Sequence, residues 1–290
     1  MLAVLEQAAN GLMMGSLYAL FAVGMVLIFG VMGVLNFAHG VLFMLGAYLC
    51  QLIFTRIVGN YPLAILASML LLAVIGMALE RSIFRRLRLH LSMQIVASLG
   101  LILVVQNLVI GLFGPNALSL RIDATAAAVR LGPLRFTLQQ VVIVLAVMAT
   151  VTALHLFLSR SKFGIAIRAT AQNEEAARVV GVNPNRIYLL VFALGSALAA
   201  LGGALLGPLF LIFPQMGDLP MLKALTAIVL GGVGSVGGAI VGGFVIGLLE
   251  AESTLVLPTD YRDAVVFSVL ILTLLVMPRG LFGVRLRGDA

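Results

Sequence analysis

Apolar stretches long enough to cross a lipid bilayer follow one another along most of this chain. A bilayer core about 30 Å thick needs roughly 20 apolar residues in helical form. The stretches near that length are 8–31, 36–55, 62–80, 91–113, 138–158, 187–213, 221–249 and 262–278. Because 62% of the 290 residues are hydrophobic and only 10% are charged, a water-soluble enzyme is excluded. The sequence predicts an all-α polytopic membrane protein with about eight transmembrane segments.

The basic residues indicate which ends of these stretches face the cytoplasm. Twelve of the 18 lysines and arginines lie in three patches beside apolar stretches, at 81–88, 160–186 and 279–287. Cytoplasmic loops are enriched in basic residues, so we expect both interior patches in the cytoplasm. Segment 114–137, which contains several turn residues, is then an external loop, with a small hairpin as the alternative. No aromatic-rich basic groove accompanies the patches, which argues against nucleic acid as a partner.

The glycine-rich centre of 221–249 predicts a broken or re-entrant segment. An unbroken span would place the basic tail outside, against the positive-inside rule. A break returns the C-terminus to the cytoplasm and leaves the N-terminus outside. Glycine supplies the backbone freedom that a break needs, and the candidates are Gly231, Gly232, Gly234, Gly237 and Gly238. Three of them also fit a G-x-G-x-x-G pattern, but membrane-length flanks do not supply the strand that a dinucleotide site requires.

Small residues recur at four-residue spacing in several stretches. The pairs are Gly11/Gly15, Gly203/Gly207, Gly238/Gly242 and Gly243/Gly247. Such spacing lets helix backbones approach closely. We interpret these pairs as helix packing within the chain, with a subunit interface as the alternative.

Segment 168–186 predicts a short cytoplasmic helix with well-defined ends. Asn173 suits the N-cap, and Glu174 and Glu175 follow in the first turn, where the helix dipole favours negative charge. Gly181 suits a left-handed C-terminal cap, and Pro184 prevents continuation. A helix of about two turns is too short to be stable alone in water. We expect it to lie alone in its loop and to dock on a partner surface.

Five motifs in the same order along the chain resemble the branched-chain amino acid permeases of bacterial ABC importers. Glu175-Ala176-Ala177 followed by Gly181 resembles the E-A-A-x-x-x-G signature of importer permeases, and the string 168–177 resembles this family in particular. The other similar segments are 30–35, 36–40, 226–249 and 277–283. Together the motifs cover nearly the whole chain, and the similarity is to the H-type permeases.

The resemblance implies a single transmembrane permease domain over 1–290, with 159–187 as the cytoplasmic coupling loop. In this family that loop lies in a groove of the ATPase subunit. The residues implied for ATPase coupling are Arg168, Asn173, Glu174, Glu175, Ala176, Ala177 and Gly181. The implied partners are a second, M-type permease, two ABC ATPases and a periplasmic binding protein, in the bacterial inner membrane. The ATPases would hold ATP and magnesium, and this chain, which has no P-loop motif, would bind no cofactor and carry out no catalysis.

Polar residues within the apolar stretches are candidates for the translocation path or its gate. Asn36 and His39 form a turn between two stretches, which the charge pattern places at the cytoplasmic end; a plain polar turn at the membrane surface is the alternative. Gln94, Ser98 and Gln106 share one helix face, and they either line the path or bond to a neighbouring helix. Glu80 and Lys223 are interpreted as residues at the ends of spans.

The predicted function is translocation of leucine, isoleucine and valine by alternating access. A related permease for urea, short amides or another small solute is one alternative. A self-sufficient channel or secondary carrier is another, and an intramembrane enzyme is a third. A proton-driven carrier or an enzyme would place ionisable residues at depth, and the sequence offers no converging set of them. The single cysteine, Cys50, excludes a disulfide framework and a cysteine-based metal site.

Overall fold

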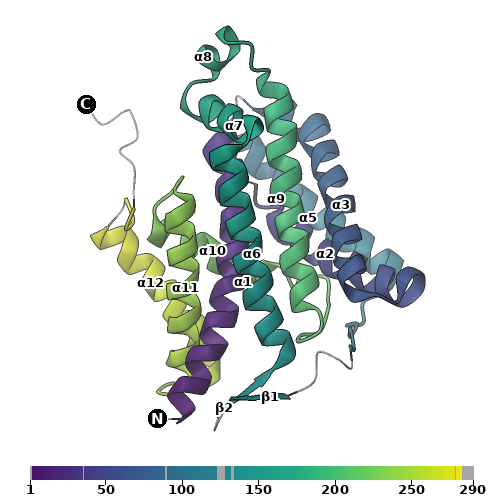
Figure 1. Cartoon of the computed structure of the whole chain (residues 1–290), viewed down its shortest axis with the longest axis vertical. Helices are drawn as coiled ribbons and strands as arrows, with labels where there is room; N and C mark the ends of the chain where they lie inside the picture. Colours follow the sequence, from purple (N-terminus) through teal and green to yellow (C-terminus); the bar gives the residue numbers. More distant parts are fainter. Residues whose placement is uncertain are drawn as a thin grey trace. The chain divides into compact units, whose positions relative to one another are not determined.

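The computed structural model describes residues 2–34, 36–88, 90–122, 128–131, 134–277 and 279–282, and these are almost entirely helical (Figure 1). The expected all-α class is confirmed. The exception is an antiparallel pair, β1 (Ala128–Leu131) and β2 (Leu134–Thr137), in which Ala128 lies opposite Thr137. The pair falls in the segment expected as an external loop with a hairpin as the alternative. Residues 132 and 133, between the strands, lie outside the described residues.

The helices follow the apolar stretches with additions in the loops. In chain order they are α1 (Leu2–Met32), α2 (His39–Ile53), η1 (Phe54–Val58), α3 (Tyr61–Leu79), η2 (Glu80–Phe84), α4 (Arg85–Leu87), α5 (Leu91–Phe113), α6 (Leu138–Arg160), α7 (Lys162–Gln172), α8 (Glu174–Val179), α9 (Pro184–Leu206), α10 (Asp218–Gly231), α11 (Val236–Ser253), η4 (Thr259–Tyr261) and α12 (Arg262–Val276). Here η1 and η2 are π-helical and η4 is a 3₁₀ turn. Some residues of the family-like motifs (35, 278 and 283) and of the basic tail (285 and 287) lie outside the described residues.

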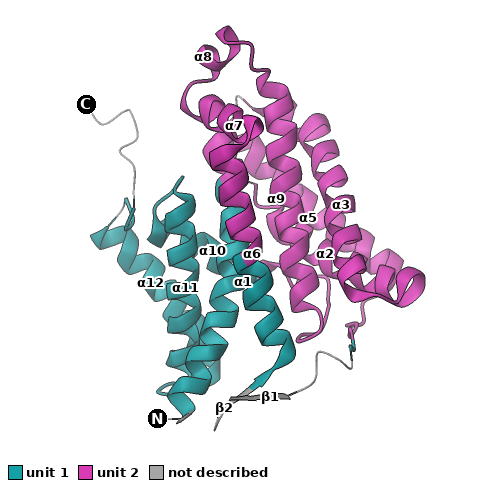
Figure 2. Cartoon of the chain, in the orientation of Figure 1, with its two compact units in different colours: residues 1–26, 121–148, 219–290 teal, residues 27–120, 149–218 magenta. Residues whose placement is uncertain are grey.

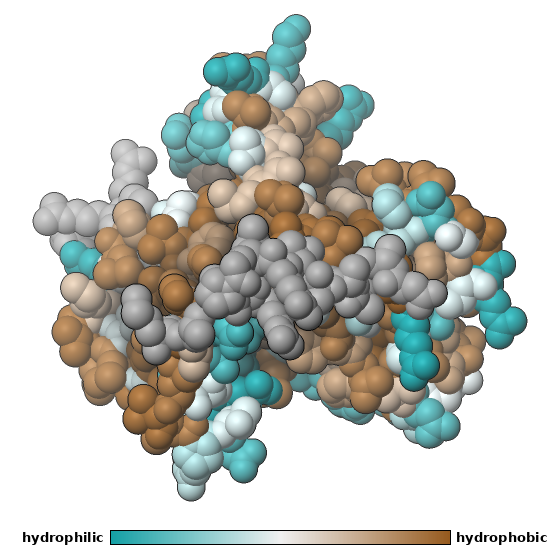
Figure 3. Space-filling model, turned by 60° about the horizontal axis from the view of Figure 1, so that its bottom comes forward, coloured by the Kyte–Doolittle hydropathy of each residue, from teal (hydrophilic) through white to brown (hydrophobic). Residues whose placement is uncertain are grey.

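Seven helices of the described part are long and apolar enough to cross a membrane. They are Ala3–Met32, His39–Val58, Tyr61–Leu87, Leu91–Phe113, Leu138–Arg160, Pro184–Leu206 and Val236–Ser253. The eighth expected stretch forms α12, a helix of 15 residues. Large apolar side chains on the outer faces remain exposed, among them Leu70, Leu103 and Leu145, each more than 60% exposed. Figure 3 accordingly shows broad hydrophobic areas between hydrophilic patches, as expected for a multi-pass membrane protein.

The glycine-rich segment is broken, as the sequence predicts. Helix α10 ends at Gly231, and the backbone turns through Gly232 and Gly234, whose φ angles are 104° and 90°. Ser235 then caps α11, its hydroxyl accepting a hydrogen bond from the Gly238 amide at 3.0 Å. With 14 residues, α10 is about 21 Å long, too short to cross a bilayer core of about 30 Å.

The chain divides into two compact units, coloured separately in Figure 2. Unit 1 comprises residues 1–26, 121–148 and 219–290. In it α1 packs on α11 glycine against glycine: a Cβ added to Gly247 would lie 2.2 Å from the Gly15 nitrogen. Helices α10 and α11 pack in the same way, and a Cβ on Gly242 would lie 2.1 Å from the Ala227 carbonyl oxygen. These glycine pairs therefore serve helix packing within the chain, which is the interpretation that the sequence favoured.

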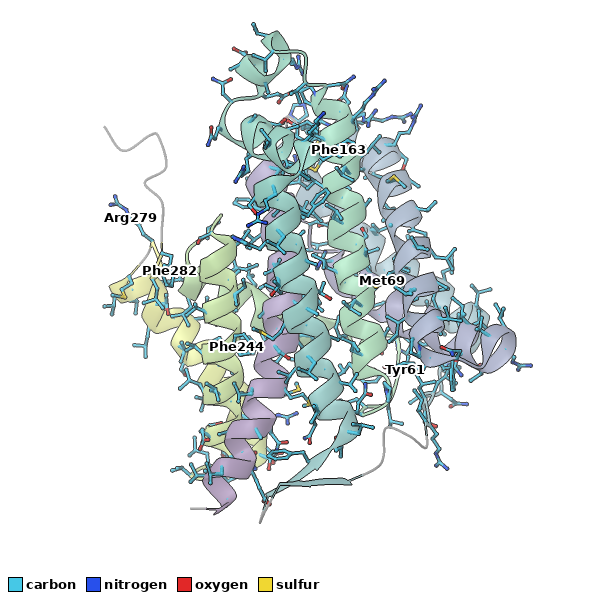
Figure 4. All side chains as sticks on the ribbon, viewed as in Figure 1. Tyr61, Met69, Phe163, Phe244, Arg279 and Phe282 are labelled. Carbon is cyan, nitrogen blue, oxygen red and sulfur yellow. The ribbon has the colours of Figure 1, made fainter. Side chains whose placement is uncertain are left out.

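Unit 2 comprises residues 27–120 and 149–218 and is built around α9. Helix α2 crosses it so closely that a Cβ on Gly203 would lie 1.9 Å from the Phe43 carbonyl oxygen. On α3, a Cβ on Gly76 would lie 2.1 Å from the Ser196 hydroxyl oxygen. Tyr61, labelled at the start of α3 in Figure 4, donates a hydrogen bond to the Ala204 carbonyl at 2.9 Å. The N-terminal end of α9 is left to carry the loop 159–187, which the sequence predicts to be cytoplasmic.

Candidate functional site

Helix α8 occupies the segment in which the sequence predicts a short capped helix. The Asn173 side chain accepts a hydrogen bond from the Ala176 amide at 3.0 Å. At the other end Gly181 has a φ of 87°, its amide donates to Arg178, and the Val182 amide donates to Ala177 at 3.0 Å. These two bonds form a Schellman motif. The helix is therefore defined at both ends by local hydrogen bonds.

Helix α8 is not alone in its loop, and that expectation was wrong. It follows α7, which is capped by Ser161 through a 2.9 Å hydrogen bond from the Gly164 amide. Figure 1 shows both helices at the end of α9 where that helix begins. A Cβ on Gly164 would lie 2.4 Å from the Phe157 carbonyl oxygen, so α7 turns back tightly on the end of α6. Nothing in the sequence analysis separated 162–172 from the loop, because its few apolar residues make no membrane-length stretch.

The two neighbouring glutamates of α8 face different surroundings. Glu174 is partly buried: it accepts from Arg178 at 2.5 Å and from the Tyr188 hydroxyl at 2.8 Å. Glu175 is exposed, and the described part of the chain gives it no hydrogen bond or ion pair. Glu174 thus holds α8 to α9, while the carboxylate of Glu175 stays available to another molecule.

The other predicted coupling residues divide between support and surface. Arg168 donates to the Ser159 carbonyl at 3.3 Å and so ties α7 to the end of α6. Ala177 is buried, whereas Ala176 and Gly181 are exposed. The apolar residues that follow, Val179 and Val180, are 88% and 75% exposed. The loop therefore presents the exposed carboxylate of Glu175 and two exposed valines at the C-terminal end of α8.

The polar turn at Asn36 and His39 is buried and lies away from the loop that carries α8. The Asn36 side-chain oxygen accepts from the Ala38 amide at 3.1 Å, and both Asn36 and His39 are less than 5% exposed. The next residue, Gly40, touches Gly217: a Cβ there would lie 2.0 Å from the Gly40 carbonyl oxygen. The first turns of α2 pack on the last turns of α9, opposite to the end that carries α8. This position differs from the cytoplasmic end that the charge pattern favoured.

Helix α5 buries its polar face, as the shared spacing of these residues predicts. Its buried residues are Gln94, Ser98, Gln106 and Val109. Gln94 donates to the carbonyls of Leu87 and Arg88 at 3.1 and 3.0 Å, and so closes the turn that precedes α5. Gln106 donates to the Asp218 carboxylate at 3.1 Å. The two amides are 12 residues apart, about 18 Å along the helix, and do not converge on one site.

Unit 1 contains an ionic cluster that the sequence did not predict. Lys223, 3% exposed, lies 2.7 Å from Glu250 and 2.7 Å from Asp263. The Tyr18 hydroxyl donates to Glu250 at 2.7 Å. Lys223 is therefore a buried ion-pair partner and not simply a residue at the end of a span. The one available signal was its position among apolar residues, since a charge at such a place requires a partner.

Among the residues that the structure describes, no group of three or more His, Cys, Asp or Glu side chains could hold a metal ion.

Comparisons with known proteins agree with this picture. The family described as "Branched-chain amino acid transport system / permease component" matches residues 7–274. The high-affinity branched-chain amino acid transport system permease protein LivH of Escherichia coli K12 is 34% identical over 293 residues, which cover 96% of this chain and 95% of that protein. BraD of Pseudomonas aeruginosa, described in the same words, is 35% identical over 301 residues with the same coverage. The xylose transport system permease protein XylH of E. coli K12 is 36% identical over 122 residues, 39% of this chain and 31% of that protein. No solved structure matches.

Proposed function

This chain belongs to the family of branched-chain amino acid transport system permease components, and from this premise we propose that it is the H-type permease subunit of an ATP-driven importer of leucine, isoleucine and valine. It is a multi-pass protein of the inner membrane. The observation that carries the proposal is similarity to LivH and BraD over 96% of the chain, together with a capped helix α8 whose Glu175 is exposed.

The surface of the coupling loop supports an ATPase as the partner. Val179 and Val180 are bare in the chain, and Phe163 on α7, labelled in Figure 4, is 62% exposed. These residues lie beyond the membrane helices, where water would surround them. Apolar side chains in water carry an unfavourable hydration free energy, and contact with an apolar groove on a partner protein would remove it. The free carboxylate of Glu175, beside them, gives the groove a charge to recognise.

The remaining partners follow from the resemblance. We propose a second, M-type permease that completes the pathway, two ATPases that hold ATP and magnesium, and a periplasmic binding protein that delivers the substrate. In this arrangement a loaded binding protein docks on the outer loops, and ATP closes the ATPase dimer. The motion reaches the membrane helices through residues 168–181, and the pathway opens alternately to each side.

Branched-chain substrates are preferred over the alternatives because the similarity to LivH and BraD extends over 96% of the chain, whereas the match to the xylose permease covers 39%. An apolar pathway suits an amino acid with an aliphatic side chain. Recognition can rest with the binding protein, since a transient path selects weakly.

The test is purification of the tagged chain from its native membrane in mild detergent, followed by reconstitution of the complex with radiolabelled leucine. We expect a P-loop ATPase to accompany the chain and uptake to require ATP. Competition by urea and by xylose distinguishes the related permeases. Uptake by the solitary chain without an ATPase would contradict the proposal and favour a channel or secondary carrier.

Reversal of charge at Glu175 isolates the coupling step. In a Glu175→Lys variant we expect the chain still to insert into the membrane. Its affinity for the ATPase should fall at least tenfold, about 1.4 kcal/mol of binding free energy, so that the ATPase is lost on purification and uptake falls at least tenfold. The matched control is Glu6→Lys, since Glu6 is an exposed glutamate of α1. Wild-type uptake and ATP hydrolysis in the Glu175→Lys variant would refute the role of this residue.

A further inference from the structure

A carboxylate is buried at the cytoplasmic end of α3. Glu80, fully buried, opens the π-helical segment η2. Arg85 reaches it with two nitrogens, at 3.2 and 2.8 Å, and Arg88 lies 3.0 Å from it. Moving a charged group from water into the protein interior costs free energy. A pair of well-packed apolar residues often stabilises a protein at least as much as a buried ion pair does. A role other than stability is therefore worth seeking.

The two arginines join this carboxylate to α9. Arg88 lies with its guanidinium carbon 3.9 Å from the centre of the Tyr188 ring, and it donates to the Asn185 side chain at 3.3 Å. Arg85 donates to the Asn185 carbonyl at 3.4 Å. An arginine stacked on a tyrosine ring is held by cation–π attraction and by its fixed planar shape. The end of α3 and the first turn of α9 are thus fastened by polar contacts.

Tyr188 extends the connection to α8. Its ring lies against Arg88, and its hydroxyl donates to Glu174 at 2.8 Å. An unbroken series of contacts therefore runs from Glu174 through Tyr188 and Arg88 to Glu80. The series begins on the helix with the exposed carboxylate and ends at the cytoplasmic end of a membrane helix.

Apolar packing already holds α3 on α9 without this series. Phe84 and Phe192, both fully buried, stack with ring centres 5.0 Å apart. Arg88 and Tyr188 lie one turn beyond that stack, toward the cytoplasm. The polar series consequently adds a link to α8 that the aromatic stack does not provide.

We propose that Tyr188 and Arg88 form a mechanical relay that transmits displacement of α8 to Glu80 at the end of α3. The inference rests on the proposed function for its purpose, since α8 must be moved by a partner. Tyr188 is the positioning residue at the centre, because its hydroxyl and its ring face different helices. The relay does not bind substrate.

The first test measures transmission without any substrate or partner. Asn173→Ala removes the N-terminal cap of α8 and leaves Tyr188 untouched. We expect it to raise amide hydrogen exchange in α8 about fivefold, the typical effect of losing a cap, and to raise exchange within residues 80–88 as well. In a Tyr188→Phe background, which keeps the ring and loses the hydroxyl, the same change should leave residues 80–88 unaltered. An equal effect in both backgrounds, or none in the first, would overturn the relay.

The second test measures what the relay does in the assembled importer. Tyr188→Phe should retain the ATPase on purification and lower leucine imported per ATP hydrolysed about fivefold. Tyr188→Leu, which also removes the ring, should lower it further. Tyr261→Phe is the control, since Tyr261 is 58% exposed in the 3₁₀ turn η4 of unit 1. An unchanged transport ratio in Tyr188→Leu would contradict the relay. If the wild-type chain brings no ATPase and imports no leucine, the proposed function fails, and the exchange measurement still decides on the relay.

Discussion

Lys223 is one of two lysines in the chain, and its ion pairs with Glu250 and Asp263 make its replacement costly in free energy of unfolding. Replacement by methionine removes the nearest cation from the buried carboxylate of Glu250 and from the partly exposed carboxylate of Asp263, and leaves only the more distant Arg262, 3.7 Å from Glu250. We expect Lys223→Met to destabilise the protein by about 3–5 kcal/mol, the usual cost of breaking one side of a buried pair. Thermal unfolding in detergent measures this loss.

The comparison variants identify charge as the cause. Lys162→Met changes the other lysine, which is exposed at the start of α7, and should leave the unfolding temperature nearly unchanged. Lys223→Met combined with Glu250→Gln should recover part of the loss, because one uncompensated charge is removed. Equal unfolding temperatures for Lys223→Met and the wild type would show that the cluster does not contribute to stability.

Residue-level prediction succeeds where the cause is local. The caps of α8 follow from Asn173 and Gly181, because each acts on backbone groups a few positions away. The opposite environments of Glu174 and Glu175 do not follow, since the partner of Glu174 is Tyr188, fourteen positions along the chain. The Lys223 cluster was missed for the same reason, because Glu250 is 27 positions away.

At the scale of elements, the glycines decide how closely the helices pack. A methyl group at Gly203 would overlap the backbone of α2, whereas Gly111 on α5 has open space around it. We expect Gly203→Ala to reduce the yield of folded protein severalfold, because backbone atoms cannot rotate away as a side chain can. Gly111→Ala should be neutral. Size-exclusion profiles of the two variants in detergent measure the difference, and an unaltered profile for Gly203→Ala would contradict the close crossing.

Element-level prediction also depends on what the pattern can express. Stretches of membrane length give the spans directly, and the glycines at 231–238 give the break between α10 and α11. Helix α7 was missed because its eleven residues are too mixed to stand out from a loop. The π-helical segment η2 was not predicted, because the apolar pattern does not distinguish a π-helical turn from an α-helical one.

At the scale of the whole molecule, the charge pattern predicts the side of the membrane on which each loop lies. Cysteines introduced at Val180 and Ile57, which are 75% and 72% exposed, test it. We expect an impermeant thiol reagent to label Val180→Cys only from the cytoplasm and Ile57→Cys only from outside. The native Cys50 is fully buried and should stay silent. Labelling of both positions from the same side of the membrane would contradict the predicted topology.

The turn at Asn36 shows the limit of that pattern. Charge places a loop on one side of the membrane but says nothing of how deeply a turn without charges lies. The depth of this turn depends on the contact of Gly40 with Gly217, which are distant in the sequence. The fold class and the capped helix α8 could thus be predicted from the sequence, and the positions of the buried polar residues could not.

The crossing of α2 over α9 has a further consequence for the kind of force that joins the two helices. Where an added Cβ would lie 1.9 Å from the Phe43 carbonyl oxygen, a Gly203 Cα–H group points at that oxygen instead. Such Cα–H···O contacts contribute about 0.5–1 kcal/mol each and recur at helix–helix interfaces. They need no side-chain rotamer to be fixed, so two helices joined in this way can change their crossing angle without repacking a layer of interlocked side chains.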